Sequence, residues 1–183
     1  MLRRSSSSAL TTKSRSRWWW LVELLIILLI VLGFRAWNQM DLLSGAAPSF
    51  KAEMISGEQV ELIDYRGEPL LLYFWLPDCI SCNLQQSTMT ELMKNHSVLT
   101  VVNANNKEQV LAYMAEKGIS DWPTIVDEKG DIYRQFGVTA TPTHYIIDGE
   151  GMIRFREIGL STSWGLRLRL WFAGERMNDE VMP

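Results

Sequence analysis

An unbroken apolar run, LLLYFW at positions 70–75, lies between Pro69 and Pro77. Six apolar residues between two breakers predict a strand that is buried on both faces of a sheet. Cys79 and Cys82 follow directly, and apolar residues at helical spacing come after them. The sequence therefore predicts a C-x-x-C motif at the point where a central strand turns into a helix.

The chain beyond this motif alternates between strand and helix patterns. The run VLTVV at 98–102 predicts a second buried strand, and 107–117 predicts a helix that ends at Gly118. The order strand, helix, strand, helix implies a parallel βαβ unit with a right-handed crossover. Two further strands are expected at 143–148 and 152–158, joined in a hairpin by the glycines between them. These patterns predict an α/β fold.

Two more elements are expected at the ends of this domain. The segments 50–54 and 59–62 flank Ser56-Gly57 and predict an N-terminal hairpin. Ser161 or Thr162 can cap a last helix. The apolar positions of that helix follow a helical spacing and predict its packed face: Trp164, Leu168, Trp171 and Phe172.

A long apolar segment, WWWLVELLIILLIVLGF at 18–34, carries one charge, Glu23. Counted on to Trp37 it is about 30 Å of helix, the thickness of a bilayer core. Five basic residues precede it and Arg35 follows it closely, which predicts a cytoplasmic N-terminus and an exported remainder. A signal peptide cleaved near Ala46 or Ala47 is the alternative.

The domain boundaries follow from this segment. We expect a cytoplasmic basic tail over 1–17, a transmembrane anchor over 18–37, a linker over 38–49, an exported domain over 50–175 and a C-terminal tail over 176–183. The charge is divided in the same way, with a balance of +5 in residues 1–40 and −8 in residues 41–183. Since phosphate contacts need a basic face, the exported part is not expected to bind nucleic acid.

The two cysteines are the whole thiol inventory of the chain. Cys79 is expected at the first turn of a helix, where free N–H groups and the positive helix end stabilise a thiolate. Cys82 returns to the same face, so Cys79 can attack a foreign disulfide and Cys82 can resolve the mixed disulfide. A zinc site would need about four ligands, and the other good candidates, His96 and His144, lack finger spacing. A structural disulfide closing so short a loop would constrain the unfolded chain little.

The motif F-W-x-x-x-C-x-x-C after a central strand and the segment TATPT at 139–143 resemble the thioredoxin superfamily, over about residues 46–175. The anchor, the N-terminal hairpin and THYIID at 143–148 are similar to its TlpA/ResA-like exported branch. The ending EIGLSTSWGLRLRLW at 157–171 is similar to the suppressor-of-copper-sensitivity protein D group within that branch. The resemblance implies a thioredoxin-like fold, a mixed central sheet flanked by helices with an N-terminal β-hairpin extension.

The resemblance also implies roles for particular residues. Pro142 is expected to be cis, and Thr141 and Pro142 are expected to position the client strand, while Trp75 is the expected active-site aromatic. Two positions depart from the family pattern. Tyr73 stands where thioredoxins have a buried Asp, and Gln85 stands where ResA-like proteins have a Glu, so no family proton acceptor for the second cysteine is evident.

The expected function is a membrane-anchored thiol:disulfide oxidoreductase of the bacterial periplasm, single-pass in the inner membrane and without a bound cofactor. Its expected partners are exported protein disulfides and a membrane electron-donor protein. Asp78 opposes a thiolate on Cys79 by like charge, and Ile80-Ser81 adds no cation, which favours a reductant or isomerase over a disulfide-forming oxidant. The alternative from another class is a copper- or zinc-binding thiol protein of metal tolerance, which would use the same thiolates as soft ligands.

Overall fold

The computed structural model describes residues 17–38 and 42–180, which fall into two compact units divided after Asn38. The first unit contains α1 (Arg17–Asn38), a helix of 22 residues. Among the helices of the described residues, none meets the length and apolarity needed to cross a membrane. Three parts of the predicted segments lie outside the described residues: 1–16 of the tail predicted over 1–17, 39–41 of the linker and 181–183 of the C-terminal tail.

The second unit is built on a mixed sheet of six strands in the order β1-β8-β7-β4-β5-β6. β4 runs parallel to β5, and β5 runs parallel to β6, whereas β7 is antiparallel to β4 and to β8. The strands are β1 (Gly45–Ala46), β4 (Leu70–Trp75), β5 (Ser97–Val102), β6 (Thr124–Val126), β7 (Thr143–Ile147) and β8 (Met152–Ile158).

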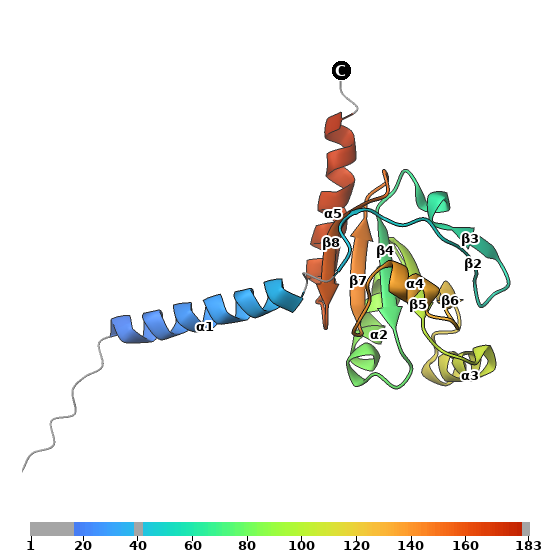
Figure 1. Ribbon diagram of the computed structural model, residues 1–183, viewed down its shortest axis with the longest axis horizontal. Coiled ribbons are helices and arrows are strands. Elements are labelled where there is room, and N and C mark those ends of the chain that lie inside the picture. The colour runs from blue at the N-terminus through green and yellow to red at the C-terminus, as the bar shows by residue number, and fades with distance from the viewer. Residues whose placement is uncertain (1–16, 39–41, 181–183) are drawn as a thin grey trace, which may run out of the picture. The chain divides into compact units, whose positions relative to one another are not determined.

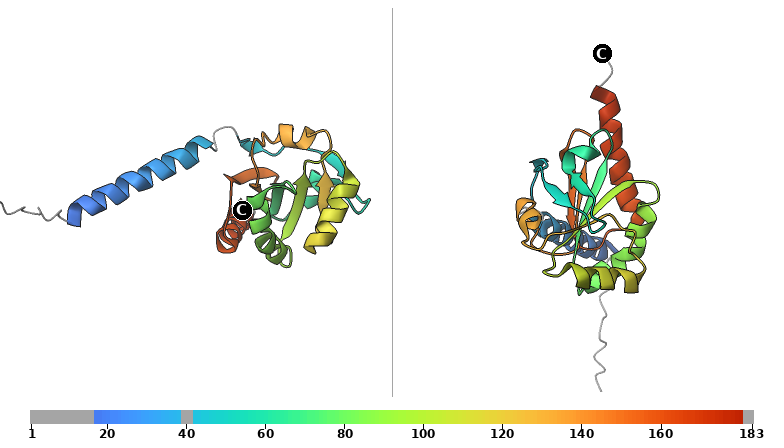
Figure 2. Two further views of the ribbon diagram at one scale, coloured as in Figure 1. Left: turned by 90° about the horizontal axis from the view of Figure 1, so that it is seen from below. Right: turned by 90° about the vertical axis from the view of Figure 1, so that its right-hand side faces the viewer.

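Helices cover one face of this sheet, and a hairpin with two short helices covers the other (Figures 1 and 2). The first face packs against α2 (Ile80–Leu92), α3 (Lys107–Lys117) and α5 (Ser163–Glu180). The second face packs against β2 (Lys51–Glu53), β3 (Gln59–Glu61), the 3-10 helix η1 (Leu62–Tyr65) and α4 (Asp131–Gln135).

β4 shows why an unbroken apolar run was needed at the centre of the sheet. All six of its residues are buried. Alternate side chains enter different clusters: Leu71, Tyr73 and Trp75 face the α2 side, whereas Leu70, Leu72 and Phe74 face the hairpin side. Because side chains alternate along a strand, a strand covered on both faces has no polar position.

The predicted end of α3 is confirmed. Gly118 follows Lys117 with φ +67°, in the left-handed region, and its N–H donates to carbonyls of the last turn. A residue without a Cβ takes this conformation at no steric cost, which is why a glycine ends the helix.

The packed face of α5 differs from the prediction. The buried residues are Leu166, Leu170 and Ala173, whereas Trp164 and Trp171 are 72% and 53% exposed. The helix carries two apolar stripes, and the stripe with smaller side chains packs on the sheet and α2, because it lets the backbone of the helix approach closely. The predicted cap is present, since the Gly165 N–H donates to Thr162 Oγ1 at 3.1 Å. α5 also continues to Glu180, beyond the predicted boundary at 175.

The boundary at the start of the domain also differs from the prediction. Leu42 is buried, and β1 pairs with β8 inside the segment expected to be a linker. The Ala47 N–H donates to the Gly151 carbonyl at 2.9 Å. Residues 42–49 therefore belong to the folded unit.

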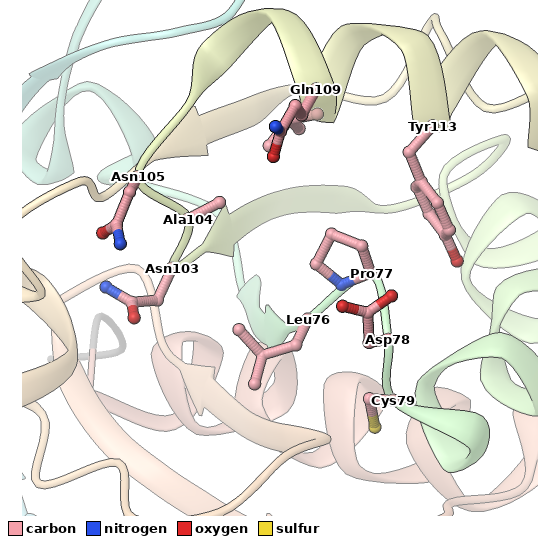
Figure 3. Close-up of a pocket in the computed structure, with 10 residues that line it drawn as sticks. Leu76, Pro77, Asp78, Cys79, Asn103, Ala104, Asn105, Gln109 and Tyr113 are labelled. Carbon is pink, nitrogen blue, oxygen red and sulfur yellow. The ribbon is translucent and has the colours of Figure 1, made fainter.

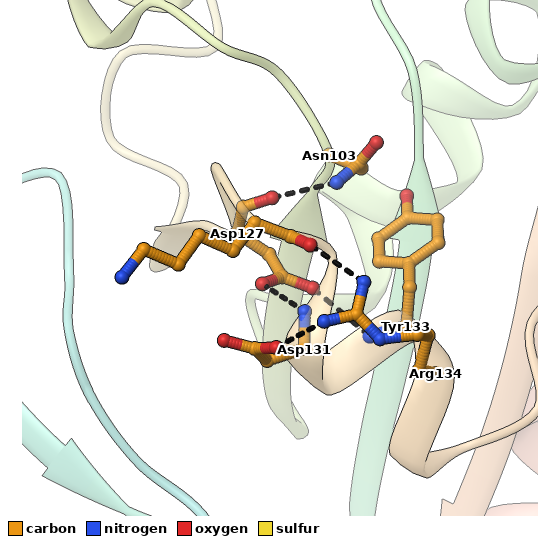
Figure 4. A network of polar contacts seen from close by, with 6 residues as sticks. Asn103, Asp127, Asp131, Tyr133 and Arg134 are labelled. Atoms are coloured by element: carbon orange, nitrogen blue, oxygen red, sulfur yellow. Dashed lines mark hydrogen bonds and ion pairs between the residues drawn. The ribbon is translucent and has the colours of Figure 1, made fainter.

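Two short elements, β6 and α4, were not predicted. Asp127, between them, accepts from the N–H groups of Asp131 at 2.8 Å and Tyr133 at 2.9 Å, which holds the first turn of α4 (Figure 4). Asn103 Nδ2 donates to the Asp127 carbonyl at 2.6 Å and so ties this turn to the end of β5. The site described below lies beside this connection.

Candidate active site

The two cysteines lie at the N-terminus of α2 and form a disulfide, with their Cα atoms 5.1 Å apart. Cys79 is the N-cap residue, and Cys82 lies in the first turn. Cys79 is half-buried, whereas Cys82 is 1% exposed. A client sulfur can therefore reach Cys79 and not Cys82.

Two hydrogen-bonding groups of the first turn of α2 lie beside the sulfur of Cys79. The Cys82 N–H donates to Sγ of Cys79 at 3.1 Å, and the Ser81 hydroxyl lies 3.2 Å from the same atom. Hydrogen bonds of this kind and the positive end of a helix stabilise a thiolate.

The Thr141-Pro142 segment lies beside this sulfur. The peptide bond before Pro142 is cis, as the resemblance implied. The Thr141 carbonyl oxygen lies 3.6 Å from Sγ of Cys79, and the Pro142 carbonyl accepts from the Gly159 N–H at 2.7 Å. The structure thus brings the two cysteines together with Thr141 and Pro142. Cys79 and Thr141 are 62 residues apart in the sequence.

Trp75 lies in the core, unlike the accessible Cys79. Its side chain is 1% exposed, and its ring lies 5.7 Å from that of Tyr113 and 6.1 Å from that of Trp122. We expected Trp75 to be the active-site aromatic, a core residue, or both. In the structure Trp75 lies in the core beneath the cysteines, so it can support them only through packing.

A pocket of about 570 Å³ opens next to Cys79 (Figure 3). It lies at the carboxyl ends of the parallel strands β4 and β5, where ligand sites of α/β sheets commonly form. The lining residues come from the loop after β4, the loop after β5 and one face of α3: Leu76, Pro77, Asp78, Cys79, Asn103, Ala104, Asn105, Gln109, Val110 and Tyr113. This pocket was not predicted. Its only signal in the sequence was the polar residues that follow the second of the two predicted strands.

A row of polar side chains crosses the sheet on the same face as Cys82. Tyr73 is paired in register with Thr100 on one side and with His144 on the other, and His144 is paired with Glu157. The rings of Tyr73 and His144 lie 5.1 Å apart. Within the described residues, neither the Tyr73 hydroxyl nor either ring nitrogen of His144 has a hydrogen-bond partner.

Burial keeps two members of this row, His144 and Tyr73, uncharged. Desolvation, helped by the Arg169 cation, lowers the pKa of His144 from 6.5 to about 3. Desolvation also raises the pKa of Tyr73 well above its ordinary value. Both side chains are therefore neutral at pH 7.

Gln85, at the position of the family Glu, has a structural role. It is buried, its Nε2 donates to the Ser161 carbonyl at 2.7 Å, and its Oε1 accepts from the Ser161 N–H at 2.9 Å. Both ends of the amide are thus used to hold the chain before α5. Glu157, the buried acid nearest in register to His144, accepts from Ser161 Oγ at 3.0 Å and pairs with Arg169 at 2.7 Å.

The arrangement does not gather ligands for a metal ion. His96 is half-buried in the turn between α2 and β5, and His144 lies within the sheet. In residues 17–38 and 42–180, no group of three or more His, Cys, Asp or Glu side chains could hold an ion.

The chain matches one protein family and is similar to individual thiol:disulfide exchange and thioredoxin-like proteins. Residues 43–156 match the AhpC/TSA family. The thioredoxin-like protein YneN of Bacillus subtilis (strain 168) is 30% identical over 157 residues, which cover 77% of this chain and 91% of YneN. The thiol:disulfide interchange protein DsbE of Xylella fastidiosa (strain 9a5c) is 30% identical over 133 residues, 68% of each chain.

A solved structure shows the same fold. The exposed lipoprotein thioredoxin of Streptococcus pneumoniae strain TIGR4 superposes with a TM-score of 0.63 at 25% identity, over 68% of this chain and 99% of that chain. The fold, the C-x-x-C pair at the start of α2 and the matched residues 43–156 agree with one another. The chain therefore belongs to the AhpC/TSA family, among its thioredoxin-like thiol:disulfide oxidoreductases.

Proposed function

We propose that this protein is a membrane-anchored thiol:disulfide oxidoreductase of the bacterial periplasm, which exchanges disulfides with exported proteins as a reductant or isomerase. The observation that carries the proposal is the inequality of the two cysteines. Cys79 is accessible, lies at the start of α2 and has the Thr141 backbone beside its sulfur, whereas Cys82 is buried behind it.

The exchange uses the two sulfurs in sequence. The Cys79 thiolate attacks one sulfur of a client disulfide, so an Sγ–S bond forms, the client S–S bond breaks and the other client sulfur leaves as a thiolate. The Cys82 thiolate then attacks Sγ of Cys79, and the second client sulfur leaves. Two electrons pass to the client, and the Cys79–Cys82 disulfide remains. A dithiol of a membrane electron donor reduces it for the next turnover.

Two features support the membrane anchor. The part of α1 from Trp19 to Ile30 exposes large apolar side chains along its length, which lipid would bury. The sequence before it is basic, which favours a cytoplasmic N-terminus and a catalytic unit outside the cytoplasm. A reporter that is active only after export, fused to the C-terminus, tests the orientation, and cytoplasmic activity would contradict it.

The proposed direction rests on the charge near Cys79. Asp78 is exposed and adjacent to the nucleophile, and the first turn of α2 brings no cation. Repulsion by Asp78 limits the stability of the thiolate, so the expected potential lies nearer the roughly −270 to −180 mV of thioredoxin and protein disulfide isomerase than the roughly −120 mV of a dedicated oxidant. Titration against glutathione measures it, and a potential above about −140 mV would make the protein an oxidant.

The roles of the cysteines are tested by trapping. Cys82→Ser should accumulate mixed disulfides with client proteins in cells, because the resolving thiol is missing. Cys79→Ser is the matched control and should accumulate almost none, because the remaining sulfur is buried. Equal trapping by the two variants would contradict the assigned roles. Failure of the wild-type protein to reduce insulin in excess chelator would favour the metal-binding alternative.

A further inference from the structure

We propose that the pocket beside Cys79 binds a lysine or arginine side chain of the client, within two residues of the client's reactive cysteine. This inference rests on the proposed function, because it names a class of client for the same nucleophile. The pocket shares Cys79 with the site of exchange. A client sulfur bonded to Cys79 therefore brings its neighbouring residues to the mouth of the pocket.

The pocket is separate from the Thr141 backbone. Thr141 lies 3.6 Å from the sulfur of Cys79 but is not one of the residues that line the pocket. A client chain passing Cys79 thus meets two regions of the protein. The backbone at Thr141 offers no selection by side chain, whereas the pocket presents side chains that can select.

The charge of the lining residues favours a cation. Asp78 is the one carboxylate among them, and none of them is basic. Asp78 has no ion pair with the other described residues and is exposed, so its charge is available to a ligand. In Figure 3 its carboxylate lies across the open space from Asn103 and Asn105.

The uncharged groups that line the pocket are also suited to a ligand that donates hydrogen bonds and accepts none. Asn103 donates from its Nδ2 to the Asp127 carbonyl, and its Oδ1 can accept a hydrogen bond. The Tyr113 hydroxyl donates to Asn83 and accepts from Gln86 Nε2 at 2.9 Å, so Tyr113 offers its ring to the pocket. Ammonium and guanidinium groups donate only, and they bind carboxylates, carbonyl oxygens and aromatic rings.

Other client side chains fit this set of groups less well. A client Glu or Asp would be repelled by Asp78, and an apolar side chain would gain nothing from the charge of Asp78. Lys117, whose Nζ lies 5.6 Å from the Tyr113 ring centre, is paired with Glu116 at 2.9 Å. It therefore does not cancel the charge of Asp78.

The test measures how fast reduced protein reacts with a matched set of peptides. Each peptide carries one cysteine as a mixed disulfide with thionitrobenzoate, whose release is coloured. The set has Lys, Gln or Glu at each of the two positions before and the two positions after the cysteine. At the position that enters the pocket, the rate with Lys should exceed the rate with Glu by roughly three- to thirtyfold, which is the effect of gaining one exposed ion pair and losing one repulsion. Added salt should reduce this ratio.

Three variants test whether Asp78 causes the preference for Lys over Glu. Asp78→Asn should bring the Lys/Glu ratio close to one, and Asn105→Asp should increase it. Asp121→Asn, which removes an exposed carboxylate outside the pocket, should leave it unchanged. The ratio is the diagnostic quantity because a change in the intrinsic reactivity of Cys79 affects all peptides equally.

The outcomes separate the two proposals. If all peptides release thionitrobenzoate but the wild-type ratio is near one at every position, the pocket inference is wrong and the proposed function stands. A ratio that persists in Asp78→Asn also overturns the inference, because the selection then arises elsewhere. If reduced protein releases thionitrobenzoate from no peptide, both proposals are wrong.

Discussion

The buried, neutral state of His144 predicts that acid destabilises the fold. Its pKa is 6.5 in the unfolded chain and about 3 in the folded protein, because burial and Arg169 both disfavour the charged ring. Below pH 6.5 the unfolded state therefore binds a proton that the folded state does not. The stabilisation is fully present above pH 6.5 and is lost as the pH falls from 6.5 toward 3.

The magnitude follows from the same two values. Between pH 7.5 and pH 5 the unfolded histidine becomes almost fully protonated while the folded one stays neutral, so the free energy of unfolding should fall by about 2 kcal/mol from this group. The ring is fully buried, so solvent does not screen the effect. The groups that face it are Tyr73 from β4, Glu157 from β8 and Arg169 from α5.

The assay is urea unfolding of the oxidised, full-length protein in a nonionic detergent at pH 7.5 and at pH 5.0. His144→Leu removes the titration, so the wild type should lose about 2 kcal/mol more than the variant between the two pH values. Comparing the two proteins cancels the pH dependence that comes from titratable groups present in both. At pH 7.5 the variant should be as stable as the wild type or more so, because it removes two buried nitrogens that lack partners. Equal acid sensitivity of the two proteins would refute the reasoning.

Three further predictions concern stability. Gln85→Ala removes both hydrogen bonds to Ser161 and should lower the free energy of unfolding in urea by about 1–3 kcal/mol. A loss below about 0.5 kcal/mol would contradict the role of Gln85 in holding the chain before α5. Asp127→Ala removes the acceptor for two N–H groups at the start of α4 and should cost roughly 1–2 kcal/mol by the same measurement, with Asp121→Ala near zero as the control. Leu170→Ala should lower stability by about 2–5 kcal/mol, whereas Trp171→Ala should change it by less than about 1 kcal/mol; the reverse order would contradict the packing of α5.

The sequence predicted the parts of this structure that depend on local patterns. The run at 70–75 predicted the central strand because a strand covered on both faces admits no polar residue, and β4 is buried throughout. Gly118 predicted the end of α3 because few other residues take a left-handed conformation there. The spacing of Cys79 and Cys82 at a strand-to-helix turn predicted a pair close enough to bond.

Short elements and choices between two faces depended on tertiary contacts. β1, β6 and α4 have two to five residues each, too few to show a periodic pattern, and they are held by pairing with β8, by pairing with β5 and by the Asp127 carboxylate. The last helix has two apolar stripes of similar spacing, and only the closeness of the sheet decides that Leu170 is buried and Trp171 exposed.

The candidate site also has parts that the sequence predicts and parts that only the tertiary structure decides. The nucleophile, its partner and the proline segment are visible in the sequence, because each is a local motif with its own chemistry. The pocket beside Cys79 is assembled from two loops and a helix, and the pairing of Tyr73 with His144 comes from strand register. No pattern within one segment records either of them, because both depend on which segments the folded sheet brings side by side.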